Sequence, residues 1–164
     1  MTIKYLIPVL FVLLASVLMG GCATSEEKAA REAELAKRVY AALAEKQFKI
    51  AVNTMVPHRG ISQNVSFGYS VEVRNDSLIS YLPYFGEVFH VPYGGGKGLN
   101  FSERIGSYME SQMKKGRRHI EIGVKNDEDT YLYTIDVYAN GSSMIDVQAR
   151  QRERISYSGQ MTFN

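Results

Sequence analysis

The chain has 164 residues, with 19 lysines and arginines against 17 aspartates and glutamates and a net charge of +2 at pH 7. Both signs are scattered along the sequence, and this near balance excludes the concentrated basic surface that is typical of nucleic-acid binding. Cys22 is the only cysteine, so the chain cannot form an intramolecular disulfide.

Residues 1–21 have the pattern of a bacterial lipoprotein signal peptide. A short start with Lys4 is followed by an apolar run over residues 6–19 and by two glycines immediately before Cys22. The run has about 14 residues, whereas a membrane-spanning helix needs about 20. Small residues at the end of such a run are typical of a cleavage site. We therefore expect residues 1–21 to be removed and Cys22 to be lipidated.

Lipid on Cys22 would hold the mature protein to a membrane. The two acyl chains of a diacylglyceryl group, at about 0.8 kcal/mol per buried CH₂, exceed what stable anchoring needs. We expect a location in the cell envelope at the outer membrane, with the periplasmic or surface-facing side left open. The alternative is ordinary secretory cleavage that leaves Cys22 as a free thiol, because Met19 stands where a lipobox more often has leucine.

A linker and one helix are predicted over residues 22–47. Thr24 and Glu27 have the spacing of a capping box, in which each side chain satisfies a backbone N–H at a helix start. The first half of the helix is rich in charged residues, and we expect it to be a solvated spacer. The second half has an apolar stripe that should pack on the following domain. This stripe consists of Leu35, Ala36, Val39, Tyr40 and Leu43.

Residues 48–164 are predicted to form one antiparallel β domain. The apolar period changes from helical to two at Phe48. One long strand is expected over residues 65–73 and a short one over residues 87–91, and the Asn140–Gly141 pair predicts a hairpin turn. About eight short strands joined by tight turns form a meander that curls, closes into a barrel or folds into a sandwich. The predicted fold class is mainly β (α+β) with one N-terminal helix.

Local motifs assign neither catalysis nor a cofactor. The glycine-rich segment around Lys97 resembles a phosphate-binding loop, but the glycine and hydroxyl positions of a Walker A motif hold Val91 and Gly98. The three histidines have no second metal-type ligand at the spacing of zinc sites. They are His58, His90 and His119. We therefore predict no metal, no cofactor and no catalytic residue.

Aromatic residues are concentrated over residues 81–101, beside two prolines and a glycine-rich loop. Rings beside a flexible backbone offer a large contact area at low entropic cost. We predict Tyr84, Tyr93 and Lys97 as ligand or partner contacts, because tyrosine has both an apolar ring and a hydroxyl and lysine can meet an anionic group. These groups suit a glycan or a peptide of an envelope protein. The alternative is that the rings fill the core and cover strand edges.

Two stretches resemble a domain-of-unknown-function family of small Bacteroidetes lipoproteins. They are Ser-Tyr-Leu-Pro-Tyr-Phe-Gly at residues 80–86 and Val-Pro-Tyr-Gly-Gly-Gly-Lys-Gly-Leu-Asn-Phe at residues 91–101. The resemblance extends from the Ala-rich helix to residues 155–159, which is nearly all of the mature chain. It implies a Gram-negative envelope and a single, mainly β domain, and it assigns no catalytic or binding residue.

Three functional classes are compatible with these features. The leading hypothesis is a monomeric, noncatalytic envelope module that binds a ligand or a protein, because the chain offers an anchor, a spacer and a β scaffold. The first alternative is an envelope hydrolase with a site near His90 and Tyr84. The second is a structural envelope component. A deep polar pocket around His90 would favour the enzyme, a shallow aromatic groove would favour binding, and a filled barrel with neither would favour the structural component.

Overall fold

The computed structural model describes residues 25–66, 68–90 and 96–163. The chain divides into two compact units, Met1–Arg31 and Glu32–Asn164. In the first unit only residues 25–31 are described, as the beginning of helix α2 (Ser25–Ala44). The predicted signal peptide, Cys22 and Thr24 lie outside the described residues. None of the helices in the described ranges is long and apolar enough to cross a membrane.

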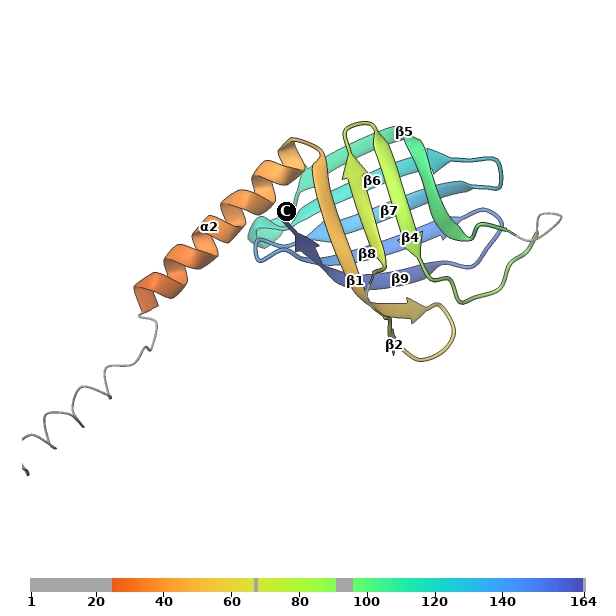
Figure 1. Cartoon of the computed structure of the whole chain (residues 1–164), viewed down its shortest axis with the longest axis horizontal. Coiled ribbons are helices and arrows are strands. Elements are labelled where there is room, and N and C mark those ends of the chain that lie inside the picture. Colours follow the sequence, from red (N-terminus) through yellow and green to blue (C-terminus); the bar gives the residue numbers. More distant parts are fainter. Residues whose placement is uncertain (1–24, 67, 91–95, 164) are drawn as a thin grey trace, which may run out of the picture. The chain divides into compact units, whose positions relative to one another are not determined.

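In the described part of the second unit, nine antiparallel strands form one sheet (Figure 1). Eight of them close into a barrel because β1 also pairs with β9, and the ninth, β2, pairs with β1 alone. The strands are β1 (Gln47–Pro57), β2 (Gln63–Asn64), β3 (Ser70–Arg74), β4 (Ser77–Leu82), β5 (Leu99–Gln112), β6 (Arg118–Lys125), β7 (Thr130–Val137), β8 (Ser142–Ala149) and β9 (Ile155–Thr162). The prediction of an antiparallel meander with one N-terminal helix is confirmed, and the barrel is the form it takes.

Closure of the barrel depends on a close approach between β1 and β9. The register shifts between Val52 and Thr54, which is the signature of a β-bulge, a feature that bends strands in barrels. Opposite this point, a Cβ atom built on Gly159 would lie 2.2 Å from the carbonyl oxygen of Ala51. Only glycine therefore allows the two backbones to pair here.

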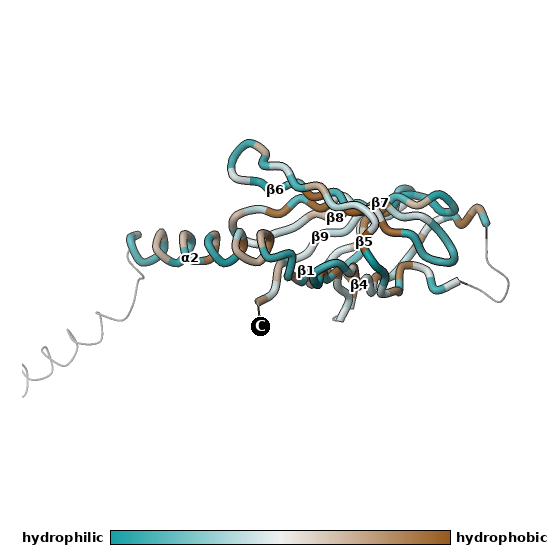
Figure 2. The backbone as a smooth tube through the Cα atoms, turned by 90° about the horizontal axis from the view of Figure 1, so that it is seen from above, coloured by the Kyte–Doolittle hydropathy of each residue, from teal (hydrophilic) through white to brown (hydrophobic). Residues whose placement is uncertain are grey.

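The barrel interior is filled with side chains. Inward positions alternate with outward ones along each strand, as the period of two requires. In Figure 2 the hydrophobic stretches of the tube follow the barrel strands. The largest fully buried rings are those of Tyr131, Tyr133 and Tyr157. Tyr133 donates its hydroxyl hydrogen to Ser80 Oγ (2.9 Å), and Ser80 donates to the carbonyl of Leu99 (2.7 Å), so these buried polar groups are satisfied.

The second half of α2 covers one end of the barrel, called here the helix end. Val39 and Leu43 are fully buried in the barrel core, as the apolar stripe predicted. Tyr40 donates a hydrogen bond of 2.8 Å to the carbonyl of Gly116, in the short 3₁₀ turn Lys114–Gly116. Three turns between neighbouring strands lie at this end, at residues 74–77, 113–118 and 137–142.

The opposite end of the barrel, called the loop end, holds the connections between the other strand termini. Two strands predicted at this end differ from those in the structure. The predicted strand over residues 65–73 is reduced to β3, because Gly68 has φ +114° and interrupts the extended backbone. The predicted strand over residues 87–91 is, within the described residues, a single bridge between Val88 and Arg152. The loops at this end cover residues 57–70, 82–99, 125–130 and 149–155.

Candidate functional site

A pocket of about 380 Å³ opens at the loop end. Its volume lies within the range of about 300–1,000 Å³ that small-molecule sites occupy. Its lining combines apolar and aromatic residues with a lysine, an asparagine and an arginine. The lining residues are Tyr69, Tyr81, Leu82, Pro83, Tyr84, Val88, Gly96, Lys97, Gly98, Leu99, Asn100 and Arg152. We call it the loop-end pocket.

One wall of the loop-end pocket is a row of outward-facing residues on β3, β4 and β5. Tyr81 on β4 pairs with Asn100 on β5 and with Ser70 on β3, so Tyr69 lies beside it. The rings of Tyr69 and Tyr81 are stacked, with centroids 5.2 Å apart and planes at 28°. Tyr81 is 52% exposed, although aromatic side chains normally bury most of their surface. The wall therefore offers an open aromatic surface beside an amide.

A buried arginine also lines the loop-end pocket. Arg152 is only 5% exposed, and its guanidinium lies over the rings of Tyr84 (5.4 Å) and Tyr131 (5.8 Å). Two carboxylates flank it, with Nη2 at 3.7 Å from Glu128 Oε2 and Nε at 3.7 Å from Asp129 Oδ2. Both distances are too long for hydrogen bonds. Among the described residues the guanidinium has no hydrogen-bond acceptor, and buried Nε is left unpaired.

The two carboxylates beside Arg152 are fixed by the backbone. Asp129 accepts hydrogen bonds of 2.7–3.0 Å from three backbone N–H groups, those of Thr130, Arg150 and Gln151. Glu128 accepts one of 2.8 Å at Oε1 from the backbone N–H of Lys97, while its Oε2 has no donor in the described structure. These bonds tie the loops around residues 97, 128 and 150 together. The positions of the two carboxylates beside Arg152 are therefore fixed by hydrogen bonds from the backbone.

Tyr84, a predicted contact, lines the pocket but has a committed hydroxyl. Its oxygen lies 2.8 Å from the carbonyl of Glu87 and 3.1 Å from that of Glu153, so the O–H donates to backbone on both loops it joins. Burial raises the pKa of Tyr84, and the nearby Arg152 charge partly opposes this rise. The hydroxyl therefore stays protonated at neutral pH, and the ring is the part of Tyr84 that faces a ligand.

Lys97, the second predicted contact, also lines the pocket, and its charge is paired. Its Nζ lies 3.2 Å from Asp127 Oδ2, and this hydrogen bond raises the pKa of Lys97. Tyr93, the third predicted contact, lies outside the described residues. Two of the three predicted residues are therefore brought into one pocket.

The residues that sequence reasoning missed are Arg152, Glu128 and Tyr69. Arg152 stands in the charged run Gln-Arg-Glu-Arg, which reads as a solvated turn. Its burial results from loops more than twenty residues away in sequence, for which no local signal exists. His90, named in the hydrolase alternative, is exposed and does not line the pocket. Within the described ranges no cluster of three metal-type ligands occurs.

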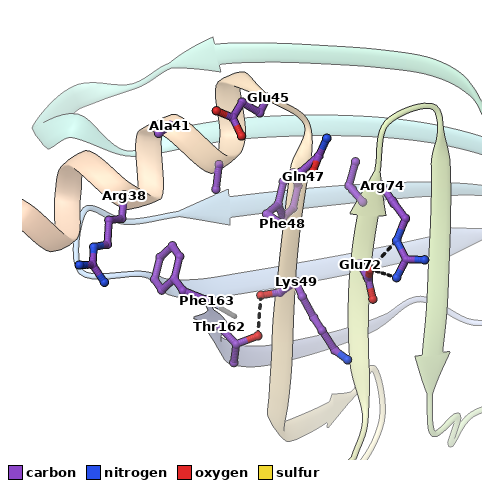
Figure 3. A pocket seen from close by; sticks show the side chains of 12 residues that line it. Arg38, Ala41, Glu45, Gln47, Phe48, Lys49, Glu72, Arg74, Thr162 and Phe163 are labelled. Atoms are coloured by element: carbon purple, nitrogen blue, oxygen red, sulfur yellow. Dashed lines mark hydrogen bonds and ion pairs between the residues drawn. The ribbon is translucent and has the colours of Figure 1, made fainter.

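A second hollow of about 730 Å³ lies beside the helix end. Figure 3 shows the side chains that line it, which come from α2 and the following turn (Arg38, Ala41 and Glu45), from β1 and β3, and from the end of β9 and Phe163 after it. Two of its charged groups bind each other, with a hydrogen bond of 2.9 Å from Arg74 Nε to Glu72 Oε1. Of the described residues with a buried unpaired polar atom, none lines this hollow, whereas Arg152 lines the loop-end pocket.

Comparison with known proteins identifies relatives of the whole domain. A crystal structure of a DUF4251 family protein from Bacteroides eggerthii DSM 20697 superposes with a TM-score of 0.62 at 15% sequence identity, covering 80% of this chain and 89% of that chain. The similarity shows a shared fold. A comparison with curated proteins found no match. The family described as "Domain of unknown function (DUF4251)" matches residues 30–161. This range includes the second half of α2, the described strands except the last residue of β9, and the loop-end pocket. The chain belongs to the DUF4251 family.

Proposed function

We propose that this protein is a lipid-anchored cell-envelope module that binds a ligand in the loop-end pocket without chemical conversion. Lipid on Cys22 holds it to the outer membrane, and the charged first half of α2 is the spacer. The anchor rests on the apolar run and the glycines before Cys22. The binding role rests on the pocket.

One observation carries the binding role: Arg152, which is 95% buried, lines an open aromatic pocket, and its Nε is buried without a hydrogen-bond partner in the described structure. A buried donor without an acceptor costs about 1–3 kcal/mol, and more when it is charged. Such a cost persists where a ligand supplies the missing acceptor. The arrangement favours binding over the hydrolase alternative, because the Tyr84 hydroxyl is held by two carbonyls and His90 lies outside the lining.

The anchor is tested by feeding labelled palmitate to bacteria that express the full chain. The wild type should incorporate label, and Cys22→Ser should not. Label on the serine variant would contradict lipidation at Cys22, and wild-type protein without label would contradict the anchor itself.

The binding role is tested with the full chain and fractions of the bacterial envelope, separated into polysaccharide, peptide and lipid. A ligand that binds only the folded state raises the unfolding temperature. At least one fraction should do so for the wild type and less for Tyr81→Ala, which removes an exposed ring. Tyr138→Ala is the matched control, because Tyr138 is an exposed tyrosine in a helix-end turn. Equal shifts for all three proteins would remove the loop-end pocket as the binding site.

A further inference from the structure

We infer that the ligand of the loop-end pocket is a neutral sugar, bound through its hydroxyl groups to Arg152 and through one ring face to Tyr81. This inference rests on the proposed function, since it names the ligand class of the same pocket. It follows from the hydrogen bonds that the pocket leaves unmade, from the charge around them and from the aromatic wall.

Unmade hydrogen bonds in the loop-end pocket are mostly donors. Arg152 contributes its terminal nitrogens, which donate to no described residue, and Nη1 lies 3.9 Å from where a Cβ on Gly98 would stand. Asn100 accepts from the backbone N–H of Leu82 (3.1 Å) at Oδ1, and its amide nitrogen donates to no described residue. Donors of this kind require acceptor oxygens on the ligand, either anionic oxygens or hydroxyls.

The local charge decides against an anionic ligand. The two charged residues that line the pocket, Arg152 and Lys97, are both positive. Three carboxylates outside the lining pair with them, those of Glu128, Asp129 and Asp127, so the group as a whole has a surplus of one negative charge. The adjoining cluster has the same surplus, because Arg59 pairs with both Glu87 and Glu153. A carboxylate or phosphate would add to this surplus, and its repulsion is screened least at Glu128 and Asp129, the two carboxylates that are buried beside Arg152. Hydroxyl oxygens accept from arginine without that repulsion.

The aromatic wall fits the flat face of a sugar ring. Tyr81 is half-exposed, and one face of its ring stacks on the ring of Tyr69, which leaves the other face for a ligand. An aromatic face attracts the polarised C–H groups of a pyranose, because its π-cloud is negative. The hydroxyls of Tyr69 and Tyr81 have no partner among the described residues, so they are free to bond at the sugar's edge. A sugar therefore meets the aromatic wall with its ring face and the polar groups of the pocket with its hydroxyls.

A peptide fits this wall less well. Extended peptides commonly bind by adding a strand to a free sheet edge. The strands of this wall have no free edge, since β3, β4 and β5 each pair on both sides. The remaining contacts are single side-chain groups, which match separate hydroxyls better than a continuous backbone.

The test is calorimetric titration and saturation-transfer NMR of the full chain in a zwitterionic, sugar-free detergent. The probes are glucose, galactose, N-acetylglucosamine, lactose and chitobiose, with glucuronate, glucose 1-phosphate and trialanine for comparison. At least one neutral sugar should bind, and its anionic counterpart should bind at least about tenfold more weakly. Tyr81→Ala and Arg152→Lys should each weaken binding of that sugar by about tenfold, because lysine keeps the charge but lacks the fork. Tyr138→Ala should bind like the wild type.

The outcomes separate the sugar from the binding role. Tighter binding of glucuronate or glucose 1-phosphate would overturn the neutral-sugar inference. Tyr81-dependent binding of trialanine without sugar binding would overturn the sugar and leave the proposed binding role standing. If no probe binds, but an envelope fraction still stabilises the wild type more than Tyr81→Ala, the sugar inference fails alone. If the fractions also fail, both proposals fall.

Discussion

The two ends of the barrel are closed by opposite kinds of chemistry. At the helix end, Val39 and Leu43 complete the apolar core with side chains that need no partner. At the loop end, the closing group is the Arg152 guanidinium, which lies between two carboxylates and makes no hydrogen bond to described residues. Apolar side chains close a barrel at a lower free-energy cost than buried charges, which lose their hydration. The loop end departs from this rule where the pocket opens, and such departures from the stability rules concentrate at functional sites.

The sharpest way to break this contrast is to remove the loop-end charge. Arg152→Met should lower the free energy of unfolding by about 4 kcal/mol, because it leaves Glu128 and Asp129 buried without a cation. Urea unfolding followed by circular dichroism measures the loss. Adding Glu128→Gln to this variant should restore part of the stability, since one uncompensated charge is then removed. An unchanged urea midpoint in Arg152→Met would show that the charges at this end contribute nothing.

The matching change at the helix end is Leu43→Ala. It should cost about 3 kcal/mol, because the lost side chain is fully buried and leaves a cavity between α2 and the barrel. The same urea experiment measures it. This cost should be the same in low and high salt, since no charge is involved. A loss below about 1 kcal/mol would mean that α2 does not seal the barrel.

A pair of tyrosine substitutions compares the ends with one chemical group. Tyr40→Phe removes the hydrogen bond to Gly116, and Tyr84→Phe removes the bond to the carbonyls of Glu87 and Glu153. Each should cost about 1 kcal/mol in urea unfolding. Hydrogen exchange should rise near residue 116 in the first variant and over residues 84–88 and 151–154 in the second. Faster exchange throughout the barrel in either variant would contradict a local role.

The smallest expected effect is a pH dependence on the wall near the helix end. His119 Nδ1 lies 2.8 Å from Asp136 Oδ1, and Nε2 lies 3.5 Å from Glu121 Oε1. The hydrogen bond to Asp136 is the main cause that raises the pKa of His119 above its ordinary 6.5. The folded state therefore holds the proton more tightly than the unfolded chain does. Its stabilisation is complete below the ordinary pKa and is lost as the pH rises through the raised one.

His119→Gln should accordingly destabilise the protein more at about pH 5 than at about pH 9. Thermal unfolding across this range measures the difference, with Asp136→Asn as a second variant that should flatten the same dependence. Equal losses at both pH values would show that the proton on His119 does not contribute to stability.

Sequence patterns predicted the strands whose neighbours are adjacent in the chain. Tyr131, Tyr133, Ile135 and Val137 alternate cleanly, and they form one buried face of β7. The Asn140–Gly141 turn is also as predicted, with Gly141 at φ +78°. Failures occur at the loop end, where alternation over residues 65–73 continues through Gly68 although the backbone does not. Alternation of apolar and polar residues predicts which face of a strand is buried, but it does not predict where the strand ends.

Of the residues that line the pocket, the sequence predicted only those in the aromatic and glycine-rich segment over residues 81–101. Tyr84 and Lys97 stand in a segment whose composition marks it, but both make structural contacts with other loops. Arg152 carries the chemistry, and nothing in its neighbourhood distinguishes it from Arg150 or Arg154. Its burial depends on the joining of loops from three separate hairpins. Likewise, the choice of barrel over sandwich depends on Gly159 meeting Ala51, a long-range contact with no local signature.

The pairing of β1 with β9 also sets when this domain can fold. Lys49 and Thr162 are 113 residues apart in the chain, yet they are partners in the closed sheet. Contacts of such long range make folding slow, because the chain entropy is lost before the contact forms. Nearly the whole domain therefore has to be synthesised before β1 can pair with β9. Until then the edge of β1 that pairs with β9 stays open, which delays burial of the core.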